Sequence, residues 1–270
     1  MKYALPVFAI LFLGAGTAEA VTLAPHRAVY DLTLMRAGDG ANLKAASGRL
    51  AFELQGSSCE GYTVSFRMAV NYRPGEGEST LMDTRSTTYE GPGGLDFRHQ
   101  VKELINGAVK EDSKLKLSRP GPNQEGQGEV SGKETQNFTV AAEAMLPLQH
   151  QLKLMALGGS GGGRDSSMVF DGSDGSKTYQ AISFVGKPKA PGSIARDAGD
   201  KVAAPLLGST AWPITVSYFS ANKGEEVPDY QVSFDLYENG VATGLVLDYG
   251  GFALSGKLTD LTIYAASECP

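Results

Sequence analysis

Polar and apolar side chains alternate without a break from Tyr62 to Tyr72, and this alternation constrains the fold more than any other feature of the chain. The even positions carry large apolar side chains: Tyr62, Val64, Phe66, Met68, Val70 and Tyr72. The odd positions carry polar or small ones: Thr63, Ser65, Arg67, Ala69 and Asn71. A period of two places the two sets on opposite faces of a β-strand, with one face buried and the other in water.

The same alternation recurs along the chain. It is clear in residues 28–34, 212–218 and 230–236, and further candidate strands lie near 48–55, 79–90, 94–105, 108–118, 126–137, 166–171, 176–186, 241–249 and 251–265. Turn residues separate these segments, and the pairs Asn106-Gly107 and Asn239-Gly240 favour tight type I′ hairpins. The sequence therefore predicts an all-β fold of about a dozen antiparallel strands, in a sheet long enough to curl on itself.

One segment departs from this pattern. Between Val140 and Leu157, apolar residues stand at helical spacing: Ala144, Met145, Leu148, Leu152, Met155 and Ala156. Pro147 should kink this helix or delay its start. A helix that is apolar on much of its circumference packs inside a curved sheet or across its mouth. We expect one kinked apolar helix near 140–157, acting either as a simple cap on one barrel end or as a plug or lid formed by Met145, Leu148, Leu152 and Met155.

The first twenty residues have the pattern of an export signal. Lys2 precedes an uncharged apolar run, and Ala18-Glu19-Ala20 matches the motif that signal peptidase cleaves. The run of about ten residues is too short to cross a bilayer core of roughly 30 Å as a helix. We predict cleavage after Ala20 and a periplasmic, non-membrane-spanning chain at 21–270, folded as a single β domain.

Cys59 and Cys269 are the two cysteines of the chain. In an oxidising compartment, two cysteines without a third favour one intramolecular disulfide, which would tie an early strand to the C-terminus. Two free buried thiols are the alternative. The chain has no C-x-x-C motif of the kind that lowers a thiol pKa for redox work.

The charge of the chain identifies no partner. The formal net charge is −6 at pH 7, and charges of both signs are scattered along the sequence. This moderate acidity argues against nucleic-acid binding and against docking on anionic lipid by charge alone. The oligomeric state cannot be read from the sequence.

No convincing catalytic set is present. Residues 158–162 match G-x-S-x-G around Ser160, but a nucleophile elbow needs a strand before the serine and a helix after it. The three histidines are too far apart in sequence to form a helical metal pair: His26, His99 and His150. A triad that uses one of them could still assemble in three dimensions. We expect no catalytic residues, no metal and no cofactor.

The segment Asp171–Gly175 resembles the start of a calcium-binding loop. An EF-hand loop would need further oxygen ligands at alternate positions and a later glutamate. Lys177 follows instead, and a lysine is a poor neighbour for a bound cation. We therefore interpret the segment as a hairpin turn.

The aromatic side chains lie mainly on the inward faces of the alternating strands. This arrangement is typical of a core, and it also suits the lining of an apolar cavity. A barrel of about a dozen strands is too wide for its own side chains to fill. An unfilled interior is the main reason to consider ligand binding.

Several segments together resemble the EipB-type cell-envelope integrity proteins of alphaproteobacteria. They are residues 24–30 (APHRAVY), 170–175 (FDGSDG), 234–241 (FDLYENGV) and the late Cys269. The resemblance covers the whole mature chain and depends on the order of these segments. It implies a periplasmic β-spiral, an incompletely closed barrel broadly like the lipoprotein carriers LolA and LolB, with a disulfide at Cys59 and Cys269. It implies no catalytic residues.

The leading hypothesis is a non-enzymatic periplasmic protein that supports envelope integrity by binding a protein partner or an apolar envelope component. A close variant is a lipid or lipoprotein carrier, whose curved sheet shelters an acyl chain. A hydrolase that acts on envelope material through Ser160 or another triad is the alternative from a different class.

Overall fold

The structure is a computed structural model that describes residues 23–191, 202, 204–220, 227–267 and 269. The predicted export signal at 1–20 lies outside these residues. The strands are β1 (His26–Ala37), β2 (Leu43–Ser57), β3 (Gly61–Pro74), β4 (Thr80–Glu90), β5 (Asp96–Ile105), β6 (Ala108–Ser118), β7 (Gly126–Ser131), β8 (Thr135–Val140), β9 (Gly163–Val169), β10 (Tyr179–Val185), β11 (Ala211–Ser220), β12 (Tyr230–Tyr237), β13 (Ala242–Asp248) and β14 (Phe252–Ile263). The helices are α1 (Pro147–Gly159) and the short 3-10 turns η1 (Pro92–Gly94) and η3 (Ala204–Leu206).

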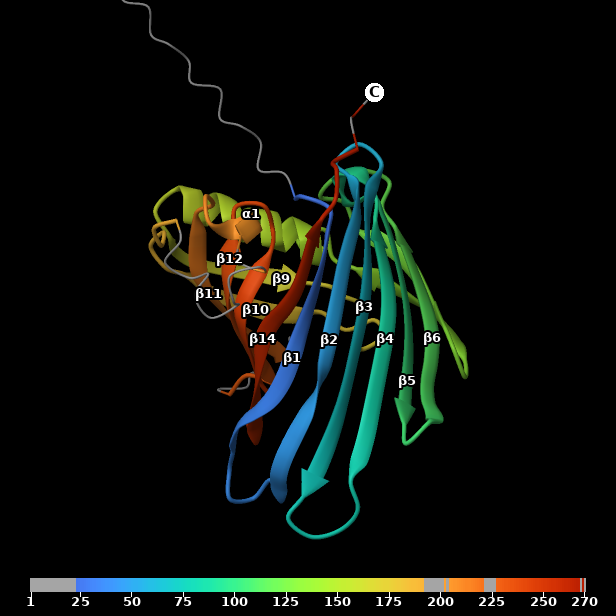
Figure 1. Cartoon of the computed structure of the whole chain (residues 1–270). Coiled ribbons are helices and arrows are strands. Elements are labelled where there is room, and N and C mark those ends of the chain that lie inside the picture. The colour runs from blue at the N-terminus through green and yellow to red at the C-terminus, as the bar shows by residue number, and fades with distance from the viewer. Residues whose placement is uncertain (1–22, 192–201, 203, 221–226, 268, 270) are drawn as a thin grey trace, which may run out of the picture.

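All of these strands belong to one 14-stranded sheet. Their order is β8-β7-β6-β5-β4-β3-β2-β1-β14-β13-β12-β11-β10-β9, and every neighbouring pair is antiparallel. In Figure 1 the long strands β1 to β6 form one wall, and the second half of the chain curls round beside it. The all-β, hairpin-connected sheet predicted from the alternation is confirmed.

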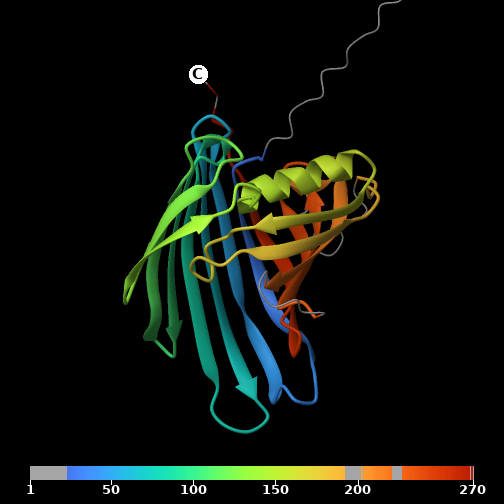
Figure 2. The same cartoon turned by 180° about the vertical axis from the view of Figure 1, so that it is seen from behind.

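The sheet curls without closing. Its two end strands, β8 and β9, are neighbours in sequence and are joined through α1, but they do not pair with each other. Met145, in the connection between β8 and α1, forms a parallel bridge with Val169 of β9. Figure 2 shows α1 lying across the upper edge of the curled sheet, above the yellow strands β9 and β10. The incompletely closed barrel is thus confirmed.

The alternation in β3 has the orientation that the sequence predicts. Tyr62 and Val70 are buried, whereas Ser65, Arg67 and Asn71 are exposed. The register carries this pattern across the sheet, since Phe66 of β3 stands opposite Phe52 of β2. One face of the wall therefore points into the curl and the other into water.

The helix begins later than the apolar spacing suggests. Pro147 is its first residue and Leu146 before it is extended, so the proline delays the helix instead of kinking it. Buried Arg119 stabilises the turn before the helix, because it donates hydrogen bonds to the carbonyl oxygens of Ala142 at 3.1 Å and Ala144 at 2.7 Å. The single strand expected near 126–137 is in fact the hairpin β7–β8, which turns between Ser131 and Thr135.

The core consists of three apolar clusters. One lies under α1 and includes Leu148, Met155 and Trp212. A second lies between β1–β3 and β11–β14. The third joins β5 and β6 to the segment after β8. Phe52 and Phe234 pack against both of the first two clusters, at the place where a cavity separates the walls.

Candidate functional site

A cavity of about 300 Å³ lies inside the curled sheet, between α1 and two sheet walls. This volume is at the lower end of the range for small-molecule sites. The lining side chains come from α1, β1–β3 and β11–β13: His26, Tyr30, Leu50, Phe52, Phe66, Pro147, His150, Gln151, Leu154, Val216, Tyr218, Val232, Phe234, Leu236, Gly240, Ala242, Leu245 and Leu247. Most of the lining is therefore aliphatic or aromatic.

Several lining side chains remain only half buried although they point into the curl. Phe66, Val232 and Phe234 have intermediate exposure, while Leu50 and Leu236, on the same inner faces, are buried. Apolar surface left uncovered inside a fold loses the packing contacts that stabilise a core. The interior is therefore not filled by the chain's own side chains in the described residues.

A buried carboxyl group holds the N-terminal end of α1. Glu90, the last residue of β4, accepts a hydrogen bond through Oε1 from the backbone N–H of Leu148 at 2.9 Å. Burial raises the pKa of Glu90 to about 8, against the lowering effect of the backbone N–H groups of Leu148 and Gln149. The Gln149 side chain in turn accepts the Leu146 N–H at 3.0 Å. These contacts satisfy amides that the first turn of a helix leaves without partners.

A second polar cluster ties the middle of α1 to β9. Lys153 Nζ lies 2.6 Å from Asp165 Oδ1, and the Ser167 hydroxyl donates to Asp165 Oδ2 at 2.7 Å. His150 Nε2 lies 3.5 Å from the same carboxylate. Burial acts to raise the pKa of Asp165, but the hydrogen bonds from Lys153 and Ser167 outweigh it and hold the pKa below its ordinary value. The helix is thus anchored at two points over the cavity.

His150 does not form a catalytic triad with its neighbours. Its Nε2 faces both the Asp165 carboxylate and, at 3.4 Å, the Ser183 hydroxyl. A triad needs the acid on one ring nitrogen and the nucleophile on the other. The geometry therefore provides no base for Ser183.

Ser160 stands at the end of α1 and not in an elbow. Its hydroxyl is exposed and donates to the Ala156 carbonyl at 3.0 Å. A helix precedes it and a strand follows, the reverse of the order that an elbow requires.

His99 and the segment Asp171–Gly175 make structural contacts. His99 bonds to the Thr88 hydroxyl at 2.9 Å through Nδ1. Asp171 accepts hydrogen bonds from the backbone and hydroxyl of Ser173 at 2.9 and 2.8 Å, so the segment forms a local turn. Within the described part of the chain, no group of three or more His, Cys, Asp or Glu residues could hold a metal ion.

The structure places the four predicted plug residues around the helix in different ways. Leu148 and Met155 are buried in the cluster under α1, and Leu152 packs against it half buried. Met145 precedes the helix and pairs its backbone with β9. The α1 residues that line the cavity are instead Pro147, His150, Gln151 and Leu154. A plug or lid role for α1 stays a prediction.

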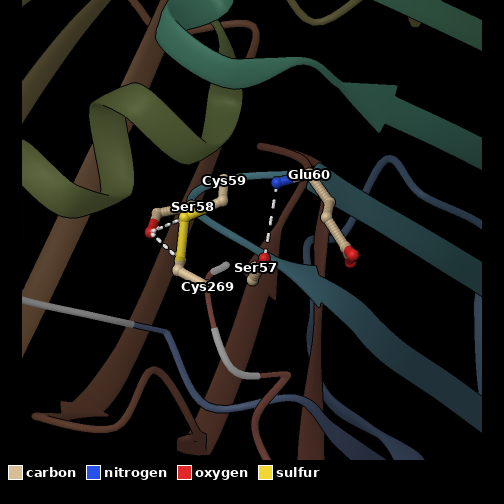
Figure 3. Close-up of a disulfide and its surroundings, with 5 residues drawn as sticks. All are labelled: Ser57, Ser58, Cys59, Glu60 and Cys269. Carbon is tan, nitrogen blue, oxygen red and sulfur yellow. Dashed lines mark hydrogen bonds between the residues drawn. A yellow bond between two sulfur atoms is a disulfide. The ribbon is translucent and has the colours of Figure 1, made fainter.

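Cys59 and Cys269 form a disulfide, with Cα atoms 5.8 Å apart and 210 positions apart in sequence. Cys59 lies in the β2–β3 turn, and Figure 3 shows Cys269 meeting it beside Ser58. The C-terminal tail reaches this turn across the start of β1, where the Tyr264 N–H donates to the Pro25 carbonyl at 2.8 Å. The bridge therefore ties the tail after β14 to the β2–β3 hairpin, two strands further along the sheet.

Glu90, Asp165 and Arg119 hold α1 and the segment before it in place, and sequence reasoning did not single them out. Glu90 is the last residue of β4, and nothing in the sequence of that strand distinguishes it from an exposed glutamate. Asp165 shares a face of β9 with Ser167, and two polar residues on one face suggest exposure, whereas both are buried. The one available signal is that both carboxyl groups fall on inward positions of the period-two pattern.

A comparison with known proteins matches nearly the whole chain. A model of the EipB-like family matches residues 17–265. The Cell envelope integrity protein EipB of Brucella abortus (strain 2308) is 34% identical over 267 residues, which is 94% of this chain and 89% of the relative. A crystal structure from Brucella abortus, a β-barrel-like protein of the domain of unknown function DUF1849, superposes with a TM-score of 0.82 at 30% identity. The superposition covers 91% of this chain and 100% of the Brucella chain. Among the described residues, no helix is long and apolar enough to cross a membrane.

Proposed function

This chain belongs to the EipB-like family, and from that premise we propose that it supports cell-envelope integrity by holding the apolar part of an envelope component in the cavity under α1. The protein acts in the periplasm and performs no chemistry on what it binds. The disulfide, the export signal and the name of the Brucella relative support this location.

The observation that carries the proposal is the unfilled apolar cavity. Natural cores pack to the density of organic crystals, with few voids larger than a water molecule. A cavity of about 300 Å³ gives up those contacts, and a bound apolar group would restore them. Because non-polar transfer contributes about 25 cal/mol per Å² of buried surface, burial of an alkyl chain in this cavity is favourable.

The helix α1 is the lid of this cavity in our proposal. It contributes Pro147, His150, Gln151 and Leu154 to the lining. It connects the two end strands of the sheet, which do not pair with each other, so it can move without breaking the ladder of paired strands. Its polar anchors, at Glu90 and Asp165, can break and re-form, while Leu148 and Met155 pack the helix against the sheet.

Binding of a fluorescent apolar probe tests this proposal. The exported protein, purified from the periplasm, is titrated with N-phenyl-1-naphthylamine. We expect saturable binding that Ala242→Phe abolishes, because Ala242 lines the cavity and a phenyl group there would fill it. Ala108→Phe is the matched control, since Ala108 is exposed on β6.

The same two variants are then tested for envelope integrity in cells that lack the protein. We expect Ala108→Phe to restore resistance to detergent and Ala242→Phe to fail, at equal protein level. If Ala242→Phe restores resistance fully, the cavity is not the basis of the envelope role, and a protein-binding scaffold becomes the better account.

A further inference from the structure

The outer face of the sheet, on the side away from the cavity, carries an arginine on each of three neighbouring strands. His26 of β1, Leu50 of β2 and Phe66 of β3 line the cavity. Successive side chains on a strand point to opposite faces, so the next residue in each strand lies on the outer face. Those outward residues include Arg27, Arg49 and Arg67. Strands β1–β3 stand side by side at the front of Figure 1.

These three arginines surround a hollow of about 640 Å³ in the outer face. Its floor consists of short side chains, those of Val29, Ala51 and Ala69. Ala51 stands opposite Val29 on one side and Arg67 on the other. Ala69 stands opposite Arg49, so short and long side chains alternate across the strands and leave the hollow between them. The arginine side chains are 42% to 67% exposed, so a ligand in solution can reach them.

The guanidinium groups at the hollow use only part of their donors within the protein. Arg49 donates to Asp31 through Nε at 3.0 Å, and Arg27 donates to Asp260 through Nη1 at 2.8 Å. Neither Nη1 nor Nη2 of Arg49 donates a hydrogen bond to any residue that the structure describes. The same holds for Nη2 of Arg27. An arginine carries five N–H donors in a fixed fork, so both side chains keep donors for an oxyanion.

Positive charge exceeds negative charge in the row of outward residues that begins at the hollow. Arg67 and Arg85 stand directly opposite each other on β3 and β4, and both donate to the single carboxylate of Asp83. Lys102 stands opposite Arg85 on β5 and pairs with Asp112. Three neighbouring cations thus share two carboxylates. Like charges directly opposite each other destabilise a sheet, so an anion bound beside this row would offset their repulsion.

From these contacts we infer that the hollow on the outer face binds a phosphate group carried by another molecule. The arginine fork matches the oxygens of a phosphate, and three forks from three strands surround a tetrahedral anion better than a planar carboxylate. The volume of about 640 Å³ is roughly twenty times that of one water molecule in the liquid. The hollow therefore has room for the phosphate and for part of the molecule that carries it. This site lies on the opposite face from the cavity and does not depend on the apolar ligand.

Titration of glucose 1-phosphate with the exported protein, followed by phosphorus NMR, tests this site. We expect a saturable change of the resonance, and Arg49→Gln should weaken the affinity at least about tenfold, as loss of a hydrogen bond to a charged group does. Ala51→Leu should weaken it to a similar extent, because the larger side chain fills the floor of the hollow and leaves every charge in place. Lys114→Gln is the matched control, since Lys114 is exposed on β6, away from the hollow. It removes the same charge as Arg49→Gln and should leave the affinity unchanged.

Cosedimentation with lipid vesicles distinguishes the two sources of a phosphate group. The vesicles consist of phosphatidylcholine, with or without phosphatidic acid, whose headgroup is an exposed phosphate. Binding of the sugar phosphate assigns the hollow to a soluble phosphate ester. Binding to the phosphatidic acid vesicles alone, lost in Arg49→Gln and in Ala51→Leu but kept in Lys114→Gln, assigns it to a lipid headgroup.

Two results would overturn the inference. One is that the wild type binds neither the sugar phosphate nor the phosphatidic acid vesicles. The other is that Lys114→Gln weakens binding as much as Arg49→Gln does, because the net charge and not the hollow would then be responsible. If Ala51→Leu does not fold, Arg49→Gln decides, since its side chain is 67% exposed and its removal leaves the core intact. The cavity variant Ala242→Phe should bind phosphate as the wild type does.

Discussion

The indole ring of Trp212 on β11 lies directly against Gly158 near the end of α1. A Cβ atom at position 158 would stand 2.6 Å from Cδ2 of that ring and 2.7 Å from Cγ. Such a separation is shorter than real Cβ contacts allow. The absence of a side chain at position 158 therefore lets α1 approach the sheet and cover the cavity.

Gly158→Ala should push the C-terminal end of α1 away from β11. We expect a loss of about 1–3 kcal/mol in the free energy of unfolding, as for other overpacked sites, together with weaker probe binding. Gly159→Ala is the control, because a Cβ there meets nothing within 4 Å and alanine favours a helix. Denaturant unfolding of both variants measures the difference, and equal stability would contradict the close approach.

Removal of the disulfide should destabilise the protein. Closing a loop of 210 positions restricts the unfolded chain, and loss of a native bridge costs roughly 2–5 kcal/mol. We expect the melting temperature of Cys59→Ala/Cys269→Ala to fall by many degrees, with a similar fall on reduction of the wild type. If mass spectrometry confirms reduction and the melting curve is unchanged, the disulfide does not stabilise the fold.

Glu90 should make stability depend on pH. Its pKa in the folded protein is raised by burial to about 8, so the folded state binds its proton more tightly than the unfolded state does. The resulting stability is fully present below about pH 4.5, the ordinary value, and is lost as pH rises through about 8. The slope contributed by one such group is at most about 1.4 kcal/mol per pH unit.

Glu90→Gln keeps an oxygen for the Leu148 N–H and removes the titration. We expect urea unfolding of this variant at pH 5 and pH 8 to show a smaller loss of stability than the wild type shows. The carboxyl of Asp83 does not interfere, because hydrogen bonds from Arg85 and Arg67 lower its pKa to about 2. If both proteins lose the same stability between these pH values, Glu90 is not the group responsible.

Ser160→Ala should leave the envelope phenotype unchanged in cells. The Ser160 hydroxyl is exposed and donates to the Ala156 carbonyl, and its place after a helix is not that of a nucleophile elbow. Detergent sensitivity of cells that carry the variant is the measurement. Loss of envelope function at normal protein level would revive the hydrolase hypothesis.

The strands were predictable because each depends on a local pattern. The inward set Tyr62 to Tyr72 and the outward Arg67 follow from a period of two, and the register then aligns whole strands. The start of α1 was less predictable from sequence. Ala144 and Met145 fit the helical spacing, but a hydrogen bond from Arg119 to Ala144 and the pairing of Met145 with β9 hold them outside the helix. That competition comes from residues distant in sequence.

The cavity could be expected in kind but not in detail. Strand number indicated an interior too wide to fill, and the family resemblance indicated the incompletely closed barrel. The sequence-based prediction placed Leu148 and Met155 on the side of the helix that faces the cavity, because it used apolar spacing alone. The cavity-lining face carries His150 and Gln151, because these polar side chains find partners on β9, β10 and the β12–β13 turn. The likeness to lipoprotein carriers stays a prediction.

Native mass spectrometry of the protein purified from its own periplasm, followed by organic extraction, tests the central claim most directly. The account predicts one apolar molecule per chain on a mass that corresponds to residues 21–270 less two hydrogens. It also predicts that Ala242→Phe, purified in the same way, carries none. A clean mass for the wild type, with no adduct and nothing in the extract, would contradict an occupied cavity and favour a role in binding a protein partner.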